Sequence, residues 1–235
     1  MKFLFKSEVI NYTFISNHSS STILFLHGWG GDKNSFTSTI NLLRSEYNIL
    51  TITIPTILPT ISIWTLHDYL TLIEEIVAIH NIKNMIIVCH SFGFRIASLM
   101  NGKFIIKKII ITGGAGLKKI KIIKKIAKNN DFLLLKHDKF KFLYKKLASK
   151  DYIRLTPINK ETFKNVVNFN GKNLIKFSCP LLLFWGKKDF DTPISLAKKI
   201  KKQNRSAQLI TTDSGHFAYL EDNDYFNHCI LEFLK

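Results

Sequence analysis

Residues 88–97, V-C-H-S-F-G-F-R-I-A, determine how the rest of this sequence is interpreted. The run before the serine, residues 84–89, is short and rich in β-branched side chains, which is typical of a buried parallel strand. Residues 92–102 place apolar side chains at helical spacing and end in a glycine, a common helix C-terminus. Ser91 therefore lies where a nucleophile elbow would hold its hydroxyl on a strained turn. Cys89 stands where that motif usually has glycine, so this stretch alone is equally consistent with an ordinary turn.

Strand and helix patterns alternate along most of the chain. The predicted strands are residues 22–26, 48–54, 84–89, 108–112, 180–185 and 207–210. The predicted helices lie near 35–43, 66–80, 92–101, 193–202 and 219–234, with Thr65 and Asp68 as a candidate capping box. This alternation predicts an α/β fold, a mostly parallel sheet covered by helices on both faces. Ligands then bind at the carboxyl ends of the strands.

One segment interrupts the alternation. Residues 117–176 carry no strand signal and are predicted to form two or three helices, as a lysine-rich cap on a core made of residues 1–116 and 177–235. Residues 117–150 alone contain twelve lysines and two aspartates. Three roles for this lysine-rich segment stay open. It could be a solvated face, a surface that binds anionic lipid, or a docking surface for an acidic carrier protein.

The net charge of +17 bears on possible partners. It could favour nucleic acid, a membrane surface or an acidic protein. Only four of the 34 basic residues are arginine, whose fork is preferred in nucleic-acid readout, so nucleic acid is not the expected partner. The chain is also rich in Ile and Asn, so a compositional bias explains the charge equally well.

Other features narrow the class of protein. No apolar stretch approaches the roughly 18 residues of a membrane-spanning helix, and the start lacks a signal-peptide cleavage site. The three cysteines have no metal-ligand spacing. The glycines of 28–31 and 113–116 fit no nucleotide-binding motif. We therefore expect a cytoplasmic protein with reduced thiols, no transmembrane segment, no metal and no organic cofactor.

Two further stretches give the serine potential partners. In F-W-G-K-K-D-F-D-T-P (184–193), Asp189 follows a predicted strand, and in D-S-G-H-F-A-Y-L-E (213–221), His216 follows the last one. The chain order Ser91, Asp189, His216 is that of the catalytic triad in α/β-hydrolases. Two other aspartates lie close enough in sequence to be alternative acids, Asp191 and Asp213.

A third stretch, H-G-W-G-G-D (27–32), also follows a strand. Its loop can present the backbone N–H of Trp29 beside that of Phe92, and two such donors would form an oxyanion hole. His27 and His90 flank the site and are expected to hold loops by hydrogen bonds. The residues predicted to contact substrate are Trp29, His27, Phe140 and Phe142.

Together the four motifs, H-G-W-G, H-S-F-G-F-R-I-A, W-G-K-K-D and S-G-H-F, resemble those of α/β-hydrolases from about residue 20 to 235. Within that superfamily the combination is similar to carboxylesterases that hydrolyse a pimeloyl-carrier-protein methyl ester in biotin synthesis. Related small esterases and carbon–carbon bond hydrolases share much of it. The resemblance implies acyl transfer by a Ser–His–Asp triad without a cofactor, and most specifically a methyl ester on an acyl carrier protein.

Two alternatives stay open at this point. The first is a general short-chain carboxylesterase or lipase-like enzyme, which would use the same triad. The second is a non-catalytic module of hydrolase fold that binds an acidic partner through its lysines.

Overall fold

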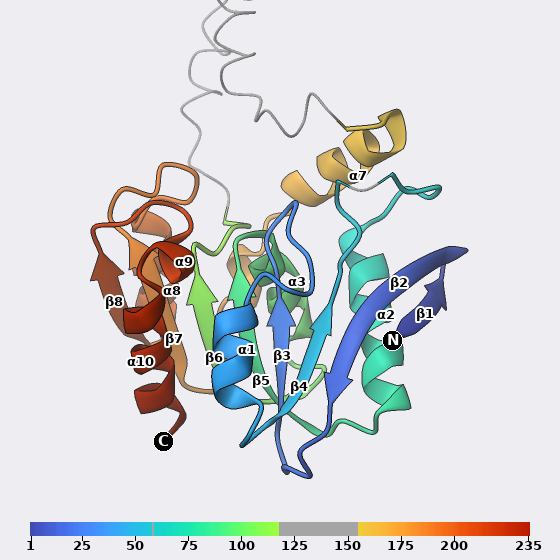
Figure 1. Ribbon diagram of the computed structural model, residues 1–235. Coiled ribbons are helices and arrows are strands. Elements are labelled where there is room, and N and C mark those ends of the chain that lie inside the picture. Colours follow the sequence, from blue (N-terminus) through green and yellow to red (C-terminus); the bar gives the residue numbers. More distant parts are fainter. Residues whose placement is uncertain (58, 118–154) are drawn as a thin grey trace, which may run out of the picture.

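The computed structural model describes residues 1–57, 59–117 and 155–235. Within them, eight strands form one sheet in the order β1-β2-β4-β3-β5-β6-β7-β8 (Figure 1). β3 to β8 run parallel, whereas β1 and β2 pair antiparallel at one edge. The strands are β1 Lys2–Phe5, β2 Glu8–Ile15, β3 Thr22–Leu26, β4 Asn48–Ile52, β5 Asn84–His90, β6 Ile105–Thr112, β7 Leu181–Gly186 and β8 Gln208–Thr212.

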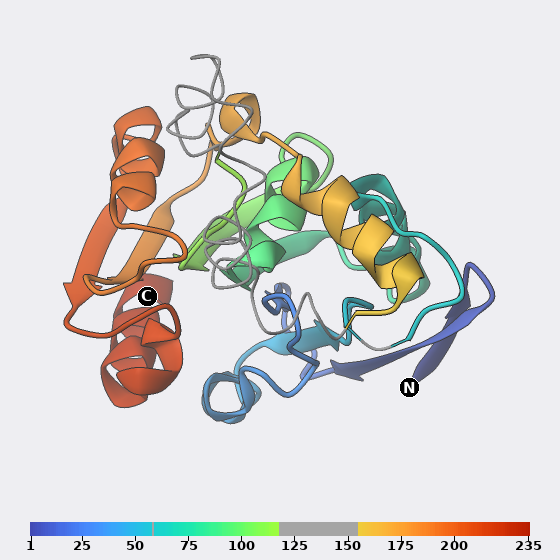
Figure 2. The same cartoon turned by 90° about the horizontal axis from the view of Figure 1, so that it is seen from above.

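Helices cover both faces of this sheet (Figure 2). Successive side chains of β3 alternate between two cores, as a pleated strand requires. Ile23 and Phe25 pack with α1, α9 and α10, whereas Leu24 and Leu26 pack with α2, α3 and α8. The helices are α1 Thr37–Leu43, α2 Leu66–Ile79, α3 Phe92–Met100, α7 Pro157–Val167, α8 Ser195–Gln203, α9 Ala218–Glu221 and α10 Asn223–Leu234, with a 3₁₀ turn at Lys172–Leu174.

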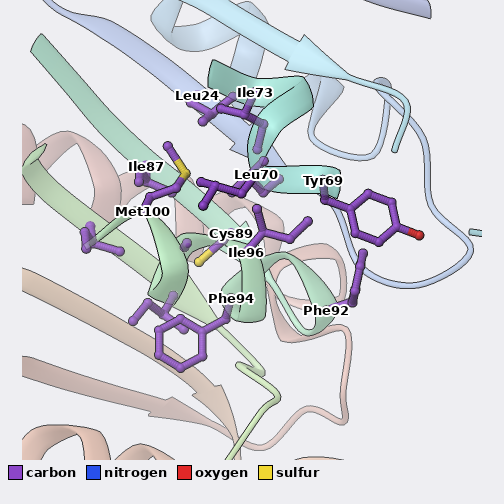
Figure 3. Packing of buried hydrophobic residues seen from close by; sticks show 14 of the residues in the cluster. Leu24, Tyr69, Leu70, Ile73, Ile87, Cys89, Phe92, Phe94, Ile96 and Met100 are labelled. Atoms are coloured by element: carbon purple, nitrogen blue, oxygen red, sulfur yellow. The ribbon is translucent and has the colours of Figure 1, made fainter. Parts of the chain in front are cut away.

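The core under α2 and α3 fixes the helix that follows the serine. Leu24 and Ile87 from the strands contact a layer formed by Leu70 of α2 and Met100 of α3 (Figure 3). All four side chains are buried, and burying each one contributes about 1.5–3 kcal/mol. The elbow before α3 is therefore mounted on a fully buried part of the core.

The predicted α/β architecture is confirmed. The capping box at Thr65 and Asp68 is present, and α7 is the last helix predicted in the 117–176 segment. The terminal helix is interrupted at Asp222, which separates α9 from α10. β1 and β2 were not predicted, although residues 9–15 carry an alternating pattern. Residues 118–154 of the predicted cap lie outside the described residues, so its boundaries stay a prediction.

Among the described helices, none is long and apolar enough to cross a bilayer. The longest, α2, has 14 residues, fewer than the roughly 20 that a spanning helix needs.

Candidate active site

Ser91 sits on the sharp turn between β5 and α3. Its backbone has φ 46° and ψ −109°, a conformation that costs a non-glycine residue about 1–3 kcal/mol. Hydrogen bonds on both sides hold it there: its N–H donates to the Thr112 carbonyl at 3.1 Å, and its carbonyl accepts from Phe94 and Ala115 at 3.1 and 3.0 Å. This strained, braced turn is the geometry of a nucleophile elbow.

The two small residues around the serine have different tasks. A Cβ on Gly93 would lie 2.2 Å from the Leu26 carbonyl oxygen, so only glycine lets α3 pack this closely on β3. Cys89 instead points into the core, where its thiol donates to the Ile110 carbonyl at 3.6 Å. Cysteine is accommodated in place of the usual glycine because its side chain fills core space.

Ser91, His216 and Asp189 form one chain of hydrogen bonds. The His216 Nε2 lies 3.0 Å from the Ser91 Oγ, and its Nδ1 lies 2.9 Å from the Asp189 Oδ2. A carboxylate only accepts, so the proton of the neutral ring belongs on Nδ1 and Nε2 is free to accept from the serine hydroxyl. This is the tautomer that a general base needs.

Backbone packing brings the histidine and the aspartate together. Asp189 follows β7 and His216 follows β8, two neighbouring parallel strands. A Cβ on Gly186 would lie 2.1 Å from the Gly215 carbonyl oxygen, so the two loops touch backbone to backbone. The glycines of W-G and S-G-H are thus part of what sets the distance between acid and base.

Asp189 is buried and fully engaged. Its Oδ1 accepts the N–H groups of Asp191 and Thr192 at 3.0 and 2.7 Å, and the Thr192 hydroxyl lies 2.6 Å from its Oδ2. Burial raises the pKa of this carboxyl, but hydrogen bonds from His216 and Thr192 outweigh burial and hold the pKa below its ordinary value. The residue therefore carries its negative charge next to the imidazole.

The other two aspartates are placed differently. Asp191 is exposed, and Asp213 is exposed and paired with Lys187 at 2.9 Å. Asp189, Asp191 and His216 together offer ligand atoms within 4.8 Å of one another. The Asp189 and His216 atoms nearest each other are already joined by a hydrogen bond, so this group is better suited to proton transfer than to metal binding.

The rings of His90 and His27 make hydrogen bonds to backbone groups around the site. His90 donates from Nδ1 to the Thr112 carbonyl at 3.0 Å, and its ring centroid lies 4.7 Å from that of His216. Burial, and secondly the neighbouring His216, lower the pKa of His90 to about 3. His27 is 1% exposed, donates from Nδ1 to the Gly28 carbonyl and accepts the Ile54 N–H. The predicted substrate contact by His27 is therefore wrong, because its ring is sealed inside the loop it holds.

The predicted oxyanion donors, Trp29 and Phe92, belong to two segments that each lie next to the serine. Phe92 is the first residue of α3, so its N–H is not used by the helix itself. A Cβ on Gly28 would lie 2.7 Å from His90 Cδ2 and 3.4 Å from Ser91 Cβ, so the loop carrying Trp29 passes directly beside the serine. Their role as an oxyanion hole stays a prediction.

The indole of Trp29 is half-buried between two aromatic rings. Its ring centroid lies 5.4 Å from that of Phe92 and 5.0 Å from that of Phe163, both edge to face. Of the predicted substrate contacts, Phe140 and Phe142 lie outside the described residues. Phe163 and Thr192 were not predicted to belong to the site. The D-F-D-T turn, in which a threonine hydroxyl can reach a carboxylate three residues back, was the available signal for Thr192.

No protein-family model matches the chain. The uncharacterized hydrolase YugF of Bacillus subtilis is 21% identical, over 96% of this chain and 94% of that protein. Among solved structures, the esterase EaEST of Exiguobacterium antarcticum matches with a TM-score of 0.73 and 16% identity, over 99% and 98% of the two chains. An alpha/beta hydrolase from a lagoon-sediment metagenome, MGS-MChE2, matches with 0.70 and 21% identity, over 95% and 94%. At these identities the structural matches establish a shared architecture over nearly the whole chain.

Proposed function

We propose that this chain, which has the α/β-hydrolase fold, is a serine hydrolase that cleaves carboxylic esters. The observation that carries the proposal is the unbroken hydrogen-bond chain from the Ser91 Oγ through His216 to Asp189, at 3.0 and 2.9 Å. A serine on a strained elbow, a histidine within hydrogen-bond reach and a buried, ionised acid behind it are the parts that acyl transfer requires. The described similarity to an esterase and to other hydrolases supports this reaction class.

The geometry suggests the order of steps. Ser91 Oγ attacks the ester carbonyl carbon while its proton passes to Nε2 of His216, and Asp189 stabilises the imidazolium. The tetrahedral intermediate expels the alcohol, which takes the proton from Nε2. Water then loses a proton to Nε2 of His216 and attacks the acyl-serine carbonyl. The second tetrahedral intermediate expels the Ser91 Oγ, which takes the proton back from Nε2, and the acid leaves. Backbone N–H groups of Trp29 and Phe92 would hold the negative oxygen in both halves of the cycle.

As substrate we propose a methyl ester carried on an acidic acyl carrier protein. The support is the charge of residues 117–150, twelve lysines against two aspartates, together with the resemblance of the motifs to carrier-dependent esterases. An acidic partner would be attracted to such a segment, which raises the association rate and makes it sensitive to salt. Phe140 and Phe142 of the same segment would supply apolar contacts to the acyl chain.

Labelling with a fluorophosphonate probe tests the reaction class. The wild-type chain is expected to be modified at Ser91, and Ser91→Ala is expected to remain unmodified. A wild-type chain that does not label, although it is folded, would instead identify a binding module without catalytic activity.

A comparison of two substrates tests the carrier. We would measure kcat/KM for a carrier-linked methyl ester and for the same ester free in solution, at low and high salt. A preference for the carrier form that collapses with salt supports docking through the lysines. Equal rates that do not respond to salt would contradict the carrier proposal and leave a general carboxylesterase.

A further inference from the structure

α7 lies over the carboxyl edge of the sheet, next to the loop that follows β4 (Figure 1). Polar contacts fasten it at more than one point along its length. Near its middle the Thr162 hydroxyl accepts the Trp64 N–H at 3.0 Å. At its C-terminal end the Arg95 guanidinium, from α3, donates to the carbonyls of Val166 and Phe169 at 2.9 and 3.1 Å. α7 is therefore anchored to the core on two sides.

Asn159 makes the deepest of these contacts. Its side chain is fully buried, and its Nδ2 donates to the Thr56 carbonyl at 2.8 Å. On the other side its Oδ1 accepts from the Thr156 hydroxyl at 2.7 Å and from the Thr60 hydroxyl at 3.0 Å. Because both ends of the amide are engaged, its orientation is fixed, and with it the backbone of Thr56.

Thr56 passes this constraint on to the loop beside the serine. Its hydroxyl, also buried, accepts the Gly30 N–H at 3.1 Å. That bond fixes the peptide plane just after Trp29. The plane just before Trp29, which carries the predicted oxyanion donor, is held by the Gly31 N–H on the Gly28 carbonyl at 3.1 Å. The turn is thus closed internally at one end and held from outside by Thr56 at the other.

A second contact from α7 reaches the same loop. Phe163, one turn after Asn159, meets the Trp29 ring edge to face with centroids 5.0 Å apart. Helix α7 therefore contacts the oxyanion loop twice, once through a hydrogen-bond relay and once through a ring.

We propose that Asn159 and Thr56 are positioning residues for the backbone donor at Trp29, so that α7 sets the geometry of the oxyanion hole. The inference rests on the proposed function. A donor must lie about 2.7–3.1 Å from the oxyanion, and a misplacement near 1 Å costs on the order of 10²-fold in rate. Residues that set this donor should therefore affect turnover without touching the proton relay.

The test compares two isosteric changes, each of which removes one hydrogen bond made by the segment between β4 and α2. Thr56→Val removes the acceptor for Gly30, whereas Thr162→Val removes the acceptor for Trp64, which is not part of the relay. We expect Thr56→Val to lower kcat for an ester about 10- to 100-fold with little change in KM. Thr56→Ser, which keeps the hydroxyl, should recover most of the rate. Thr162→Val should lose little kcat at a similar cost in stability, because Asn159 and Arg95 still anchor α7.

A trifluoromethyl ketone, which adds to the serine as a tetrahedral oxyanion, gives an independent readout. Its Ki should rise in Thr56→Val by the same factor by which kcat/KM falls, because such an analogue uses the interactions of the transition state. Asn159→Ala, provided that the variant folds, should show the same matched changes in Ki and kcat/KM. The pH dependence of kcat should stay that of the wild type.

The failures are distinguishable. An active wild-type chain in which Thr56→Val and Thr162→Val lose equal activity, or in which the loss appears in KM, overturns this inference alone. A folded wild-type chain that neither labels at Ser91 nor cleaves esters overturns the proposed function and this inference with it.

Discussion

The acid–base half of the site, Asp189 and His216, is held by the sheet itself, whereas the oxyanion half, residues 27–31, is held partly from α7. The loops after β7 and β8 are joined by backbone hydrogen bonds, from Lys187 to the Thr212 carbonyl at 2.8 Å and from Lys188 to the Ser214 carbonyl at 3.0 Å. The oxyanion loop has one backbone hydrogen bond of its own, from the Gly31 N–H to the Gly28 carbonyl. Its contacts to the segments that come from outside are made by side chains, the Thr56 hydroxyl and the Phe163 ring.

The difference separates what the core determines from what the inserted segment determines. Proton transfer depends on backbone contacts between neighbouring strands, which tolerate little variation. In our proposal, oxyanion stabilisation depends on a helix in the segment between β6 and β7, so a change in that helix should alter turnover while the triad stays in place. The next four predictions test this division.

Both halves act on the reaction of Ser91, so its loss should have the largest effect. Ser91→Ala is expected to lower kcat by at least about 10⁴-fold, because the nucleophile is gone while binding and the oxyanion donors remain. The melting temperature should change little, because the hydroxyl makes only the contact to His216 among the described residues. A variant that retains a tenth of the activity would show that another group attacks the ester.

Replacing the acid isolates the acid–base half. Asp189→Asn should lower kcat about 10³- to 10⁴-fold, because an amide facing Nδ1 favours the wrong tautomer of His216. Asp191→Asn is the matched control, two residues away and exposed, and should change kcat by less than roughly threefold, as a surface substitution that leaves the triad intact. The measurement is kcat of both variants. A larger loss of kcat in Asp191→Asn than in Asp189→Asn would make Asp191 the acid.

His90 lies between the two halves, against the His216 ring and beneath Gly28. Its pKa is about 3 in the folded chain, below the ordinary 6.5. Between these two pH values the ring is protonated in the unfolded chain but not in the folded chain. The free energy of unfolding is therefore unaffected by this ring above pH 6.5, and it decreases as the pH falls toward 3. By pH 5 the loss amounts to about 2 kcal/mol.

The variant His90→Asn keeps a hydrogen-bond donor and removes this titration. Urea unfolding at pH 7 and pH 5 should show a smaller loss of stability for the variant than for the wild type. His27, whose pKa burial also lowers, is present in both proteins and so cancels. Equal losses would mean that His90 is protonated as easily in the folded chain as in the unfolded one.

Most of the sheet could be predicted from sequence because its inner strands are continuous apolar runs. T-I-L-F-L at β3 and L-L-L-F-W-G at β7 are buried at every position, which sets them apart from the helices that the structure describes. β1 is partly exposed, and β2 has only two of its eight residues buried. An edge pair of this kind gives a weak pattern, and it was missed.

The placement of the triad residues could be predicted for a different reason. Ser91 directly follows a parallel strand, Asp189 and His216 lie in the loops after two others, and the carboxyl ends of such strands meet at one edge. His27 follows a strand too, yet its ring turns inward to the Ile54 N–H, which no local pattern reveals. The contact of Asn159 with Thr56 spans 103 residues of sequence, so only the folded chain brings them together.

The smallest expected effect concerns the backbone of the oxyanion half. Gly30 has φ +82°, and a Cβ there would lie 3.5 Å from Ile57, an ordinary contact. Gly30→Ala therefore adds strain without a clash, about 1–2 kcal/mol. The loop should relieve part of it by rotating the peptides around Trp29, so kcat should fall a few-fold, while its pH dependence stays that of the wild type.

Gly102→Ala is the matched control for this prediction. Gly102 has φ +81°, with no atom within 4 Å of its added Cβ, and it lies at the end of α3 remote from the serine. Both variants should lose a similar free energy of unfolding, measured in urea, but only Gly30→Ala should lose kcat. If kcat of Gly30→Ala equalled that of Gly102→Ala, the oxyanion loop would be held as firmly as the loops of the acid–base half. That result would contradict the proposal that α7 sets the geometry of this loop.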